Sequence, residues 1–337
     1  PTIEKRVISL EGLTSSTHSL EHYGAIGTDG VINSATLLDA YNANKGSYIT
    51  FPSESIPFAS SLEILDDIVI EGRFGASMAN PSGNFPVFKV RGGVFILSGI
   101  GSVGTGKTSG STNQNFIDID SIDGDGKTDP LEINIQGVKC YNMGGMAFKL
   151  GHIAKDTSAS GSGAFRGTNI SDFHVYNSLG GVVLNTRAEF VTLDRFNINQ
   201  CELGLSIGAG NVNVPFGSIT KCEKGLHIFD GGDNAAHGLI GKLNLKHNVT
   251  NLHIEDITEG MILEGLSAFD GKVLIEDARG VDIVGGQWQT TLWTFTNVSR
   301  SRILHPSIYT SSISLAAVYN GCTTADIDFI DPLFRAN

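Results

Sequence analysis

The sequence predicts an all-β solenoid, a parallel β-helix in which short strands wind into stacked coils. Segments of similar pattern recur through the middle of the chain at intervals of 21 to 26 residues. None of these segments shows the 3.6-residue apolar period of a helix. Glycine is frequent, with 42 of 337 residues, or about 12% against roughly 7% in average proteins. A period of this length with two or three short strands is typical of one coil of a parallel β-helix.

The repeat is clearest in four segments that align without gaps. Their starts are separated by 23, 21 and 26 residues, and a fifth segment from Val138 fits with a shift of one residue. Each unit has an alternating strand, a polar corner, a Gly or Asn that tolerates left-handed backbone angles, and a second alternating strand. The four are FHVYNSLGGVVLN from Phe173, FNINQCELGLSIG from Phe196, GSITKCEKGLHIF from Gly217 and LNLKHNVTNLHIE from Leu243, with the turn residue at Gly181, Gly204, Gly225 and Asn251.

Stacked coils place equivalent residues about 4.8 Å apart, the spacing between neighbouring strands. Cys201 is therefore expected to lie on Cys222, and Glu202 near Glu223. We interpret the cysteine pair as two small apolar residues that fill one ladder. A metal or redox role for the pair is the alternative. Two interior columns are predicted: Leu205, Leu226 and Leu252, and beside them Ile207, Ile228 and Ile254.

The chain divides into an entry segment, residues 1–50, and a β-helix body, residues 51–337. Alternating apolar patterns extend the coils to earlier segments at 62–72, 88–99 and 116–123, and to later ones from 272 onward. A solenoid needs its ends covered. The stretch INSATLLDAYNA, 32–43, has an amphipathic helix pattern with Asn33 or Ser34 as N-cap. It is predicted to cap the first coil.

Residues 23–52 resemble the entry motif of the pectate-lyase-like right-handed β-helix superfamily, and within it bacteriophage tailspike and capsule-depolymerase proteins. The match lies in the YGA-x-G-DG turn, the helix that follows, and a strand that ends in Phe51 and Pro52. The chain departs from the motif by inserting Thr28 and by lacking an acidic pair after the turn. The retained turn residues are Tyr23, Gly24, Ala25, Gly27, Asp29 and Gly30.

This resemblance implies a right-handed parallel β-helix with an N-terminal capping helix. It also implies a homotrimer, in the virion tail or otherwise extracellular, that binds and often cleaves bacterial surface polysaccharide such as O-antigen or capsule. The superfamily includes hydrolases, lyases, epimerases and non-catalytic binders, so the fold does not decide the function.

Charge and composition argue against several classes of protein. The net charge is −12 with no basic stripe, which argues against nucleic-acid binding and against an anionic membrane surface. The apolar runs are far shorter than the ~18 residues of a membrane span, so no membrane insertion is expected. No C-x-x-C pair or other metal pattern occurs, and the histidines are scattered. We predict no metal, no cofactor, and reduced, buried cysteines.

Two local motifs suggest ligands that their surroundings disfavour. GSVGTGKT, 101–108, matches the phosphate-binding loop G-x-x-x-x-G-K-[ST], but no helix signal follows Thr108. We expect an exposed corner loop, a solvated or sugar-contacting Lys107, and no nucleotide.

The second motif, DIDSIDGDGKTD at 118–129, resembles the start of a calcium loop but lacks the D-x-D-x-D-G spacing and the later Glu. We interpret it as a loop of solvated carboxylates.

The candidate polysaccharide site is a ridge of loops. Insertions at 152–167, 185–190, 208–215 and 229–238 all fall at one corner of the coil, where they would stack beside a long groove. The ridge carries Asp156, Arg187, Glu189, Asp194, Asp230, Asp233 and His237.

Glycoside hydrolysis needs two carboxyl groups, and Asp230 with Asp233 is the first candidate pair. Glu189 or Glu202 could be the second partner instead, and Glu202 with Glu223 forms another pair. Lyase chemistry would need a base and a cation, for which Arg187 with His237 is the best pair. The alternative for the aspartates is a capping role in turns.

Trp288 and Trp293 are candidate sugar-stacking residues, with core packing as the alternative. The sequence therefore predicts a tailspike-like endo-glycosidase that uses paired carboxylates. A non-catalytic receptor-binding or adhesin module of the same fold, and a polysaccharide lyase or epimerase, are the alternatives.

Overall fold

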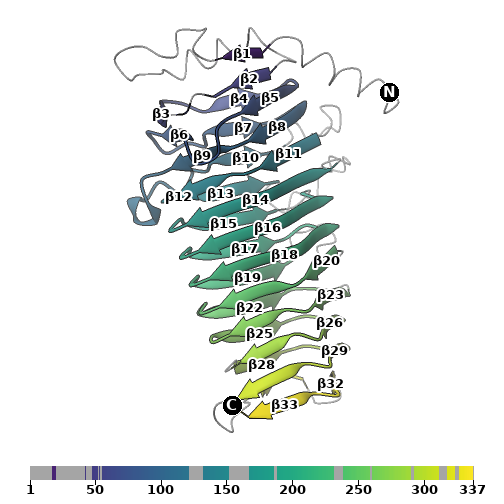
Figure 1. Ribbon diagram of the computed structural model, residues 1–337. Helices are drawn as coiled ribbons and strands as arrows, with labels where there is room; N and C mark the ends of the chain where they lie inside the picture. The colour runs from purple at the N-terminus through teal and green to yellow at the C-terminus, as the bar shows by residue number, and fades with distance from the viewer. Residues whose placement is uncertain are drawn as a thin grey trace, which may run out of the picture.

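A computed structural model describes residues 17–19, 42, 48–51, 53, 55–120, 132–151, 167–185, 188–230, 238–258, 260–289, 292–310, 317–322 and 326–336. The chain winds as a right-handed parallel β-helix whose coils stack along one axis, from β1 at one end to β33 at the other (Figure 1). Every strand pair among the described residues is parallel, with residues of successive coils in register, so the predicted fold class is confirmed. The predicted capping helix lies outside the described residues, apart from Asn42.

Each coil contributes one strand to an 11-stranded sheet, here called sheet 2. Its strands are β4 (Leu62–Ile64), β7 (Phe88–Val90), β10 (Ile117–Ile119), β13 (Met146–Leu150), β15 (Gly180–Leu184), β17 (Leu203–Ile207), β19 (Lys224–Phe229), β22 (Thr250–Glu255), β25 (Lys272–Glu276), β28 (Leu292–Thr296) and β31 (Ala317–Asn320).

The remaining strands form a 22-stranded sheet, sheet 1, with two strands per coil that merge in the middle coils. They are β1 (Thr17–Ser19), β2 (Tyr48–Thr50), β3 (Ser55–Phe58), β5 (Ile68–Glu71), β6 (Ser77–Pro81), β8 (Val94–Ser98), β9 (Ile100–Val103), β11 (Glu132–Gln136), β12 (Lys139–Tyr141), β14 (Thr168–Tyr176), β16 (Val191–Asn199), β18 (Val212–Thr220), β20 (Gly238–Gly241), β21 (Leu243–Lys246), β23 (Met261–Glu264), β24 (Ser267–Phe269), β26 (Val281–Val284), β27 (Gln287–Gln289), β29 (Ser301–Leu304), β30 (Ser307–Thr310), β32 (Ile327–Ile330) and β33 (Leu333–Ala336).

The core lies between the two sheets, where every second residue of a strand points inward. The predicted columns are confirmed: the leucines pair in register from β17 through β19 to β22, as do the isoleucines, and all are at most 1% exposed. Cys201 and Cys222 are buried free thiols, as expected for a filled ladder. A row of aromatic rings with centroids 5.0–6.4 Å apart also runs through the core, formed by Phe58, Phe88, Phe116, Phe148, Phe173 and Phe196.

The polar corner between sheet 1 and sheet 2 differs from the prediction. The left-handed residue is Gln200 or Lys221, with φ of 59° and 56°, four positions before the predicted Gly204 or Gly225. Gly204 is required for a different reason: a Cβ there would lie 2.4 Å from the carbonyl oxygen of Gly225 in the next coil. Close approach of neighbouring backbones therefore explains these glycines. Equivalent left-handed residues in other coils are Asn142, Asn177, His247 and Asp270.

Sheet 1 bends inside its long strands, at Asp172 in β14 and Arg195 in β16, both with positive φ. Arg195 binds the Asp172 carboxylate with two hydrogen bonds of 2.7 and 2.8 Å, and Gln136 donates a third at 3.1 Å. These hydrogen bonds lower the pKa of Asp172 from its ordinary value near 3.8 to about 2, and the largest cause is the hydrogen bonding with Arg195. The pair ties adjacent coils together at the bend.

The segment GSVGTGKT does not have the architecture of a phosphate-binding loop. Strand β9 ends at Val103, and the turn that follows is the three-residue 3-10 helix η2 (Lys107–Ser109). The Lys107 ammonium donates to the Gln200 carbonyl at 3.2 Å, so this half-buried side chain is hydrogen-bonded to the backbone of a later coil. In the part of the chain that is described, no helix has the length and apolar character needed to cross a membrane.

Candidate functional site

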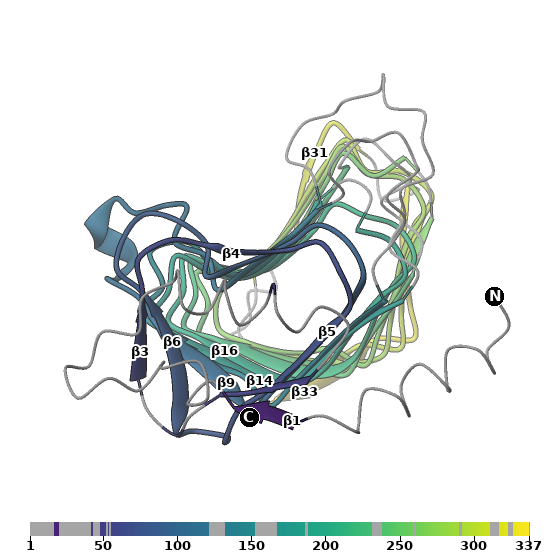
Figure 2. The ribbon, with the colours of Figure 1, turned by 90° about the horizontal axis from the view of Figure 1, so that it is seen from above.

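The outer face of sheet 2 carries one row of outward side chains, one from each coil. Seen along the axis, the coils are indented on the side where β4 is labelled (Figure 2). Since strand residues alternate between faces, the residue between two core residues must point outward here. The row begins with Glu63, Lys89, Asp118 and Lys149 and continues through Val183, Ser206, His227 and His253.

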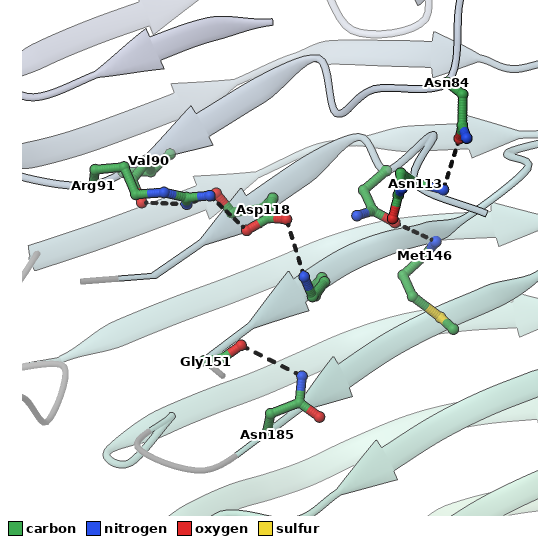
Figure 3. Close-up of polar contacts among 10 residues, drawn as sticks. Asn84, Val90, Arg91, Asn113, Asp118, Met146, Gly151 and Asn185 are labelled. Atoms are coloured by element: carbon green, nitrogen blue, oxygen red, sulfur yellow. Dashed lines mark hydrogen bonds and ion pairs between the residues drawn. The ribbon is translucent and has the colours of Figure 1, made fainter. Parts of the chain in front are cut away.

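In the N-terminal half of this row, Asp118 is held by two cationic side chains. Arg91 contacts the Asp118 carboxylate at 3.1 Å and its backbone carbonyl at 2.9 Å (Figure 3). Lys149 approaches the other carboxylate oxygen at 3.3 Å, and the Asp118 side chain is only 12% exposed. The prediction of solvated carboxylates is therefore wrong for Asp118, which forms a buried structural cluster. Residues 121–131 of the same motif lie outside the described residues.

Two histidines in the C-terminal half of the row, His227 and His253, cluster with Glu255 and Glu276, which lie in a neighbouring outward column of the same strands. His227 on β19 stacks on His253 on β22, with ring centroids 5.0 Å apart and planes at 16°. His227 Nε2 lies 2.6 Å from Glu255 Oε1, and His253 Nε2 lies 2.9 Å from Glu276 Oε2. His253 Nε2 is also 3.5 Å from Glu255 Oε2. Glu255 thus lies between two imidazoles.

Ser206 fixes the orientation of the His227 ring. Its hydroxyl is 3.2 Å from His227 Nδ1. Burial lowers the pKa of His227 below 6.5, and the opposing hydrogen bond with Glu255 does not offset it. Desolvation raises the pKa of Glu255, but the hydrogen bond with His227 and the proximity of His253 outweigh it, so its pKa is lowered overall. A neutral His227 can therefore accept from Ser206 and donate from Nε2 to a carboxylate.

The local sequence explains why these side chains meet. His227 lies between the core residues Leu226 and Ile228, so it must point outward, and His253 has the same setting one coil later. Glu255 follows two positions after His253 on the same face, and register places it beside Glu276. Sequence reasoning missed this cluster, although the aligned columns contained its signal: LHIF, LHIE and VLIE occur in three successive coils.

Part of the predicted ridge lies beyond the C-terminal ends of the sheet 2 strands, the end nearer to the histidine–glutamate cluster. Asp230 follows β19 directly, three residues after His227. Glu189 accepts a hydrogen bond of 3.3 Å from Asn211 of the next coil. The other ridge residues proposed as catalytic or substrate-binding, Arg187, Asp233 and His237, lie outside the described residues, as does Asp156.

Glu202 and Glu223 stack as predicted but lie at the opposite end of sheet 2. They precede β17 and β19, and Lys224 N donates to the Glu202 carbonyl at 2.9 Å. The six-residue strand β19 separates this end from Asp230, which at ~3.3 Å per residue is about 20 Å. A catalytic pair of Asp230 with Glu202 is therefore wrong. Asp194 is also remote from the cluster, on β16 of sheet 1, where it pairs with Arg195.

Trp288 and Trp293 are core residues. Their side chains are 1% and 0% exposed, and their ring centroids lie 4.6 Å apart. Trp288 Nε1 donates to the Gly285 carbonyl at 3.3 Å. Because neither ring has an accessible face, the prediction that they stack on sugars is wrong and the core-packing alternative holds.

Comparison with known proteins identifies the fold but no family. No protein-family model matches the chain, and no curated protein sequence matches it. The catalytic unit of a GH87 alpha-1,3-glucanase from Streptomyces thermodiastaticus matches with a TM-score of 0.57 and 11% identity, over 94% of this chain and 69% of that one. The A-module of the mannuronan C-5 epimerase AlgE6 from Azotobacter vinelandii matches with a TM-score of 0.52 and 10% identity, over 94% and 99%.

A GH87 alpha-1,3-glucanase catalytic domain in complex with nigerose also matches, with a TM-score of 0.50 and 9% identity, over 92% of this chain and 65% of that one. The chain thus spans about two thirds of the glucanase domains. At these identities the likeness establishes the β-helix fold alone.

Proposed function

We propose that the protein binds and hydrolyses a polysaccharide along the outer face of sheet 2, with Glu255 and Glu276 as the paired carboxylates. One observation carries the proposal: the two carboxylates lie in register on adjacent coils, and a histidine orients each of them. This pair replaces the pair expected from the loop residues.

The geometry of the pair suits hydrolysis with retention of configuration. Adjacent coils are ~4.8 Å apart, and retaining glycosidases have carboxyl groups ~5–5.5 Å apart. The side chains of Glu255 and Glu276 are 35% and 37% exposed, so a substrate can reach both. Glu255, held between two imidazoles, is the nucleophile in this scheme, and Glu276 is the general acid.

The fold neighbours support the general class. Glucanase and epimerase domains of the same fold act on polysaccharides, as their names state. In our proposal the polymer lies along the indented side of the coils, so that successive coils contact successive parts of it. The ridge residues would contact the polysaccharide beside the carboxylates. They are Asp230, Glu189, Arg187, Asp233 and His237.

The biological setting belongs to the same proposal. The entry motif at residues 23–52 supports a tailspike-like homotrimer of the virion tail, acting outside the cell on O-antigen or capsule. A lyase, an epimerase and a binding module without catalysis are alternative outcomes of the test.

The test is incubation with a panel of purified O-antigens and capsules, followed by size analysis and reducing-end assay. The wild type should shorten one polymer. Glu276→Gln should reduce turnover about 10³-fold, as for loss of an acid–base group, and Glu255→Gln should reduce it at least as much, because it removes the nucleophile. Glu202→Gln, at the opposite end of sheet 2, is the matched control and should retain turnover. Ultraviolet absorbance of new unsaturated uronate would favour a lyase, and binding without change of size would contradict both enzymes.

A further inference from the structure

We propose that His227, His253 and Glu255 form a binding site for a divalent transition-metal ion of the zinc type. The ligands would be the Nε2 atoms of the two histidines and one carboxylate oxygen. One ligand atom from each of the three residues lies within 4.8 Å of the other two. The inference concerns binding alone and does not depend on the proposed hydrolysis.

The three side chains meet because two come from one strand, β22, and the third comes from the preceding coil. His253 and Glu255 are two residues apart on β22 and so share its outer face, and His227 pairs with His253 in register. The Glu255 carboxylate oxygens lie 2.6 Å from His227 Nε2 and 3.5 Å from His253 Nε2. Ligand atoms about 2.0–2.1 Å from a tetrahedral zinc ion are ~3.4 Å apart, which small side-chain rotations achieve here.

A second partner is already in place for one ligand. Histidines that bind metals commonly donate their other ring N–H to a nearby acceptor, which fixes the ring. When Nε2 of His227 binds the ion, Nδ1 carries the proton, and the Ser206 oxygen 3.2 Å away can accept it. Ser206 itself is buried, so its position does not depend on solvent.

The charge at this place also suits a cation. Within the described residues, the ion pairs of Glu255 and Glu276 are with histidines. Lys224 acts on Glu255 only through longer-range electrostatic interaction. Asp118, by contrast, already has Arg91 and Lys149 in contact. A divalent ion would supply at Glu255 the permanent positive charge that Asp118 receives from the protein.

The donor set selects the kind of ion. Two imidazole nitrogens and one carboxylate suit zinc, cobalt, nickel or copper, whereas calcium and magnesium prefer oxygen ligands alone. An ion bound here occupies Glu255 and both Nε2 atoms, so metal binding and the proposed hydrolysis are alternative uses of these side chains. Glu276 lies outside the ligand set, and only the hydrolysis requires it.

The test is titration of the tag-free full chain with Co²⁺, followed by visible absorption and calorimetry. We expect one ion per chain, with an absorption band stronger than that of aqueous cobalt and no displacement by excess Ca²⁺. His227→Ala, His253→Ala and Glu255→Gln should each weaken binding more than about 100-fold, beyond the 10–100-fold typical of outer partners. Ser206→Ala should weaken it about 10-fold. Far-UV circular dichroism checks that each variant is folded.

His247→Ala is the matched control, because His247 also contacts a carboxylate of the next coil, Asp270, at 2.7 Å, but has no second histidine beside it. It should bind cobalt like the wild type. Glu276→Gln should also bind cobalt normally, although the proposed hydrolysis requires that residue. Absence of one-to-one binding by the wild type would overturn the inference. The inference would also be overturned if a folded double variant, His227→Ala with His253→Ala, bound cobalt with the affinity of the wild type.

Discussion

Asp118 and Glu255 are both carboxylates on the outer face of sheet 2, yet their partners differ in kind. Asp118 is held by a guanidinium and an ammonium group. Glu255 is held by two imidazoles, a kind of side chain that commonly transfers protons and binds metals in proteins. The same face of sheet 2 thus carries an ion cluster in one half and the histidine–glutamate cluster of the proposed site in the other. The two carboxylates share a face of the sheet and differ in the chemistry of their partners.

The largest expected effect comes from removing a histidine partner of Glu255. His227→Gln keeps an N–H donor near Glu255 but removes the imidazole. We expect polysaccharide turnover to fall about 10²-fold, because Glu255 loses the imidazole that orients it, with the fold retained. Lys149→Gln, in the half with the ion cluster, should change turnover less than about twofold. Reducing-end assays on both variants measure the difference, and equal losses would show that the two halves do not differ in function.

The reverse asymmetry is expected for stability. Asp118→Asn leaves two cations without their shared partner in a mostly buried site, and we expect a loss of about 3 kcal/mol in the free energy of unfolding. Glu255→Gln, at a more exposed site, should cost less than about 1 kcal/mol. Urea titration of both variants provides the comparison. A stable Asp118→Asn protein would mean that the ion cluster does not support the fold.

A smaller effect should follow from removing one of the two cations. Lys149→Met leaves Arg91 bound to both the carboxylate and the backbone carbonyl of Asp118. We expect a loss of about 1 kcal/mol, measured in the same urea titration. A loss as large as that of Asp118→Asn would show that lysine, and not the bidentate arginine contact, compensates the charge.

The smallest effect concerns Asp172, which has an arginine partner like Asp118 but is more exposed. Its pKa is lowered to about 2, so its contribution to stability is present above the ordinary value near 3.8 and is lost as the pH falls toward 2. Exposed pairs contribute little, so the change should be slight. Thermal unfolding between pH 5 and 2 should show a shallower decline for Arg195→Gln than for the wild type. An identical decline would contradict the role of this pair.

The fold was predictable because its signal is repeated in every coil. The spacing of the repeat and the alternation of Leu226 and Ile228 define the coil and its interior columns. The left-handed corner was misplaced because Gly204 suggests a backbone angle, whereas only the structure shows the neighbouring carbonyl that excludes a side chain. Burial of Trp288 and Trp293 was likewise undecided, because an alternating pattern does not say which face a short strand turns inward.

The candidate site was less predictable because its contacts join distant parts of the sequence. His227 and Glu255 are 28 residues apart, and the loops between them drew attention to Asp230 and Asp233 instead. The column argument that placed Leu226 over Leu252 also places His227 over His253, so the histidine pair was within reach of the sequence. The tight contact with Glu255 was not, because it depends on side-chain rotamers.

The left-handed residue at the corner before sheet 2 lies at a constant distance in sequence from the outward side chain of the strand that follows. From Lys221 to His227 and from His247 to His253 the interval is six residues, although the corners themselves are 26 residues apart and the preceding interval, from Gln200, is 21. Differences in coil length therefore fall on the other side of the coil, beyond the ends of the sheet 2 strands. A related chain can lengthen its loops there without moving a histidine, whereas one residue added after the corner would turn the histidine inward.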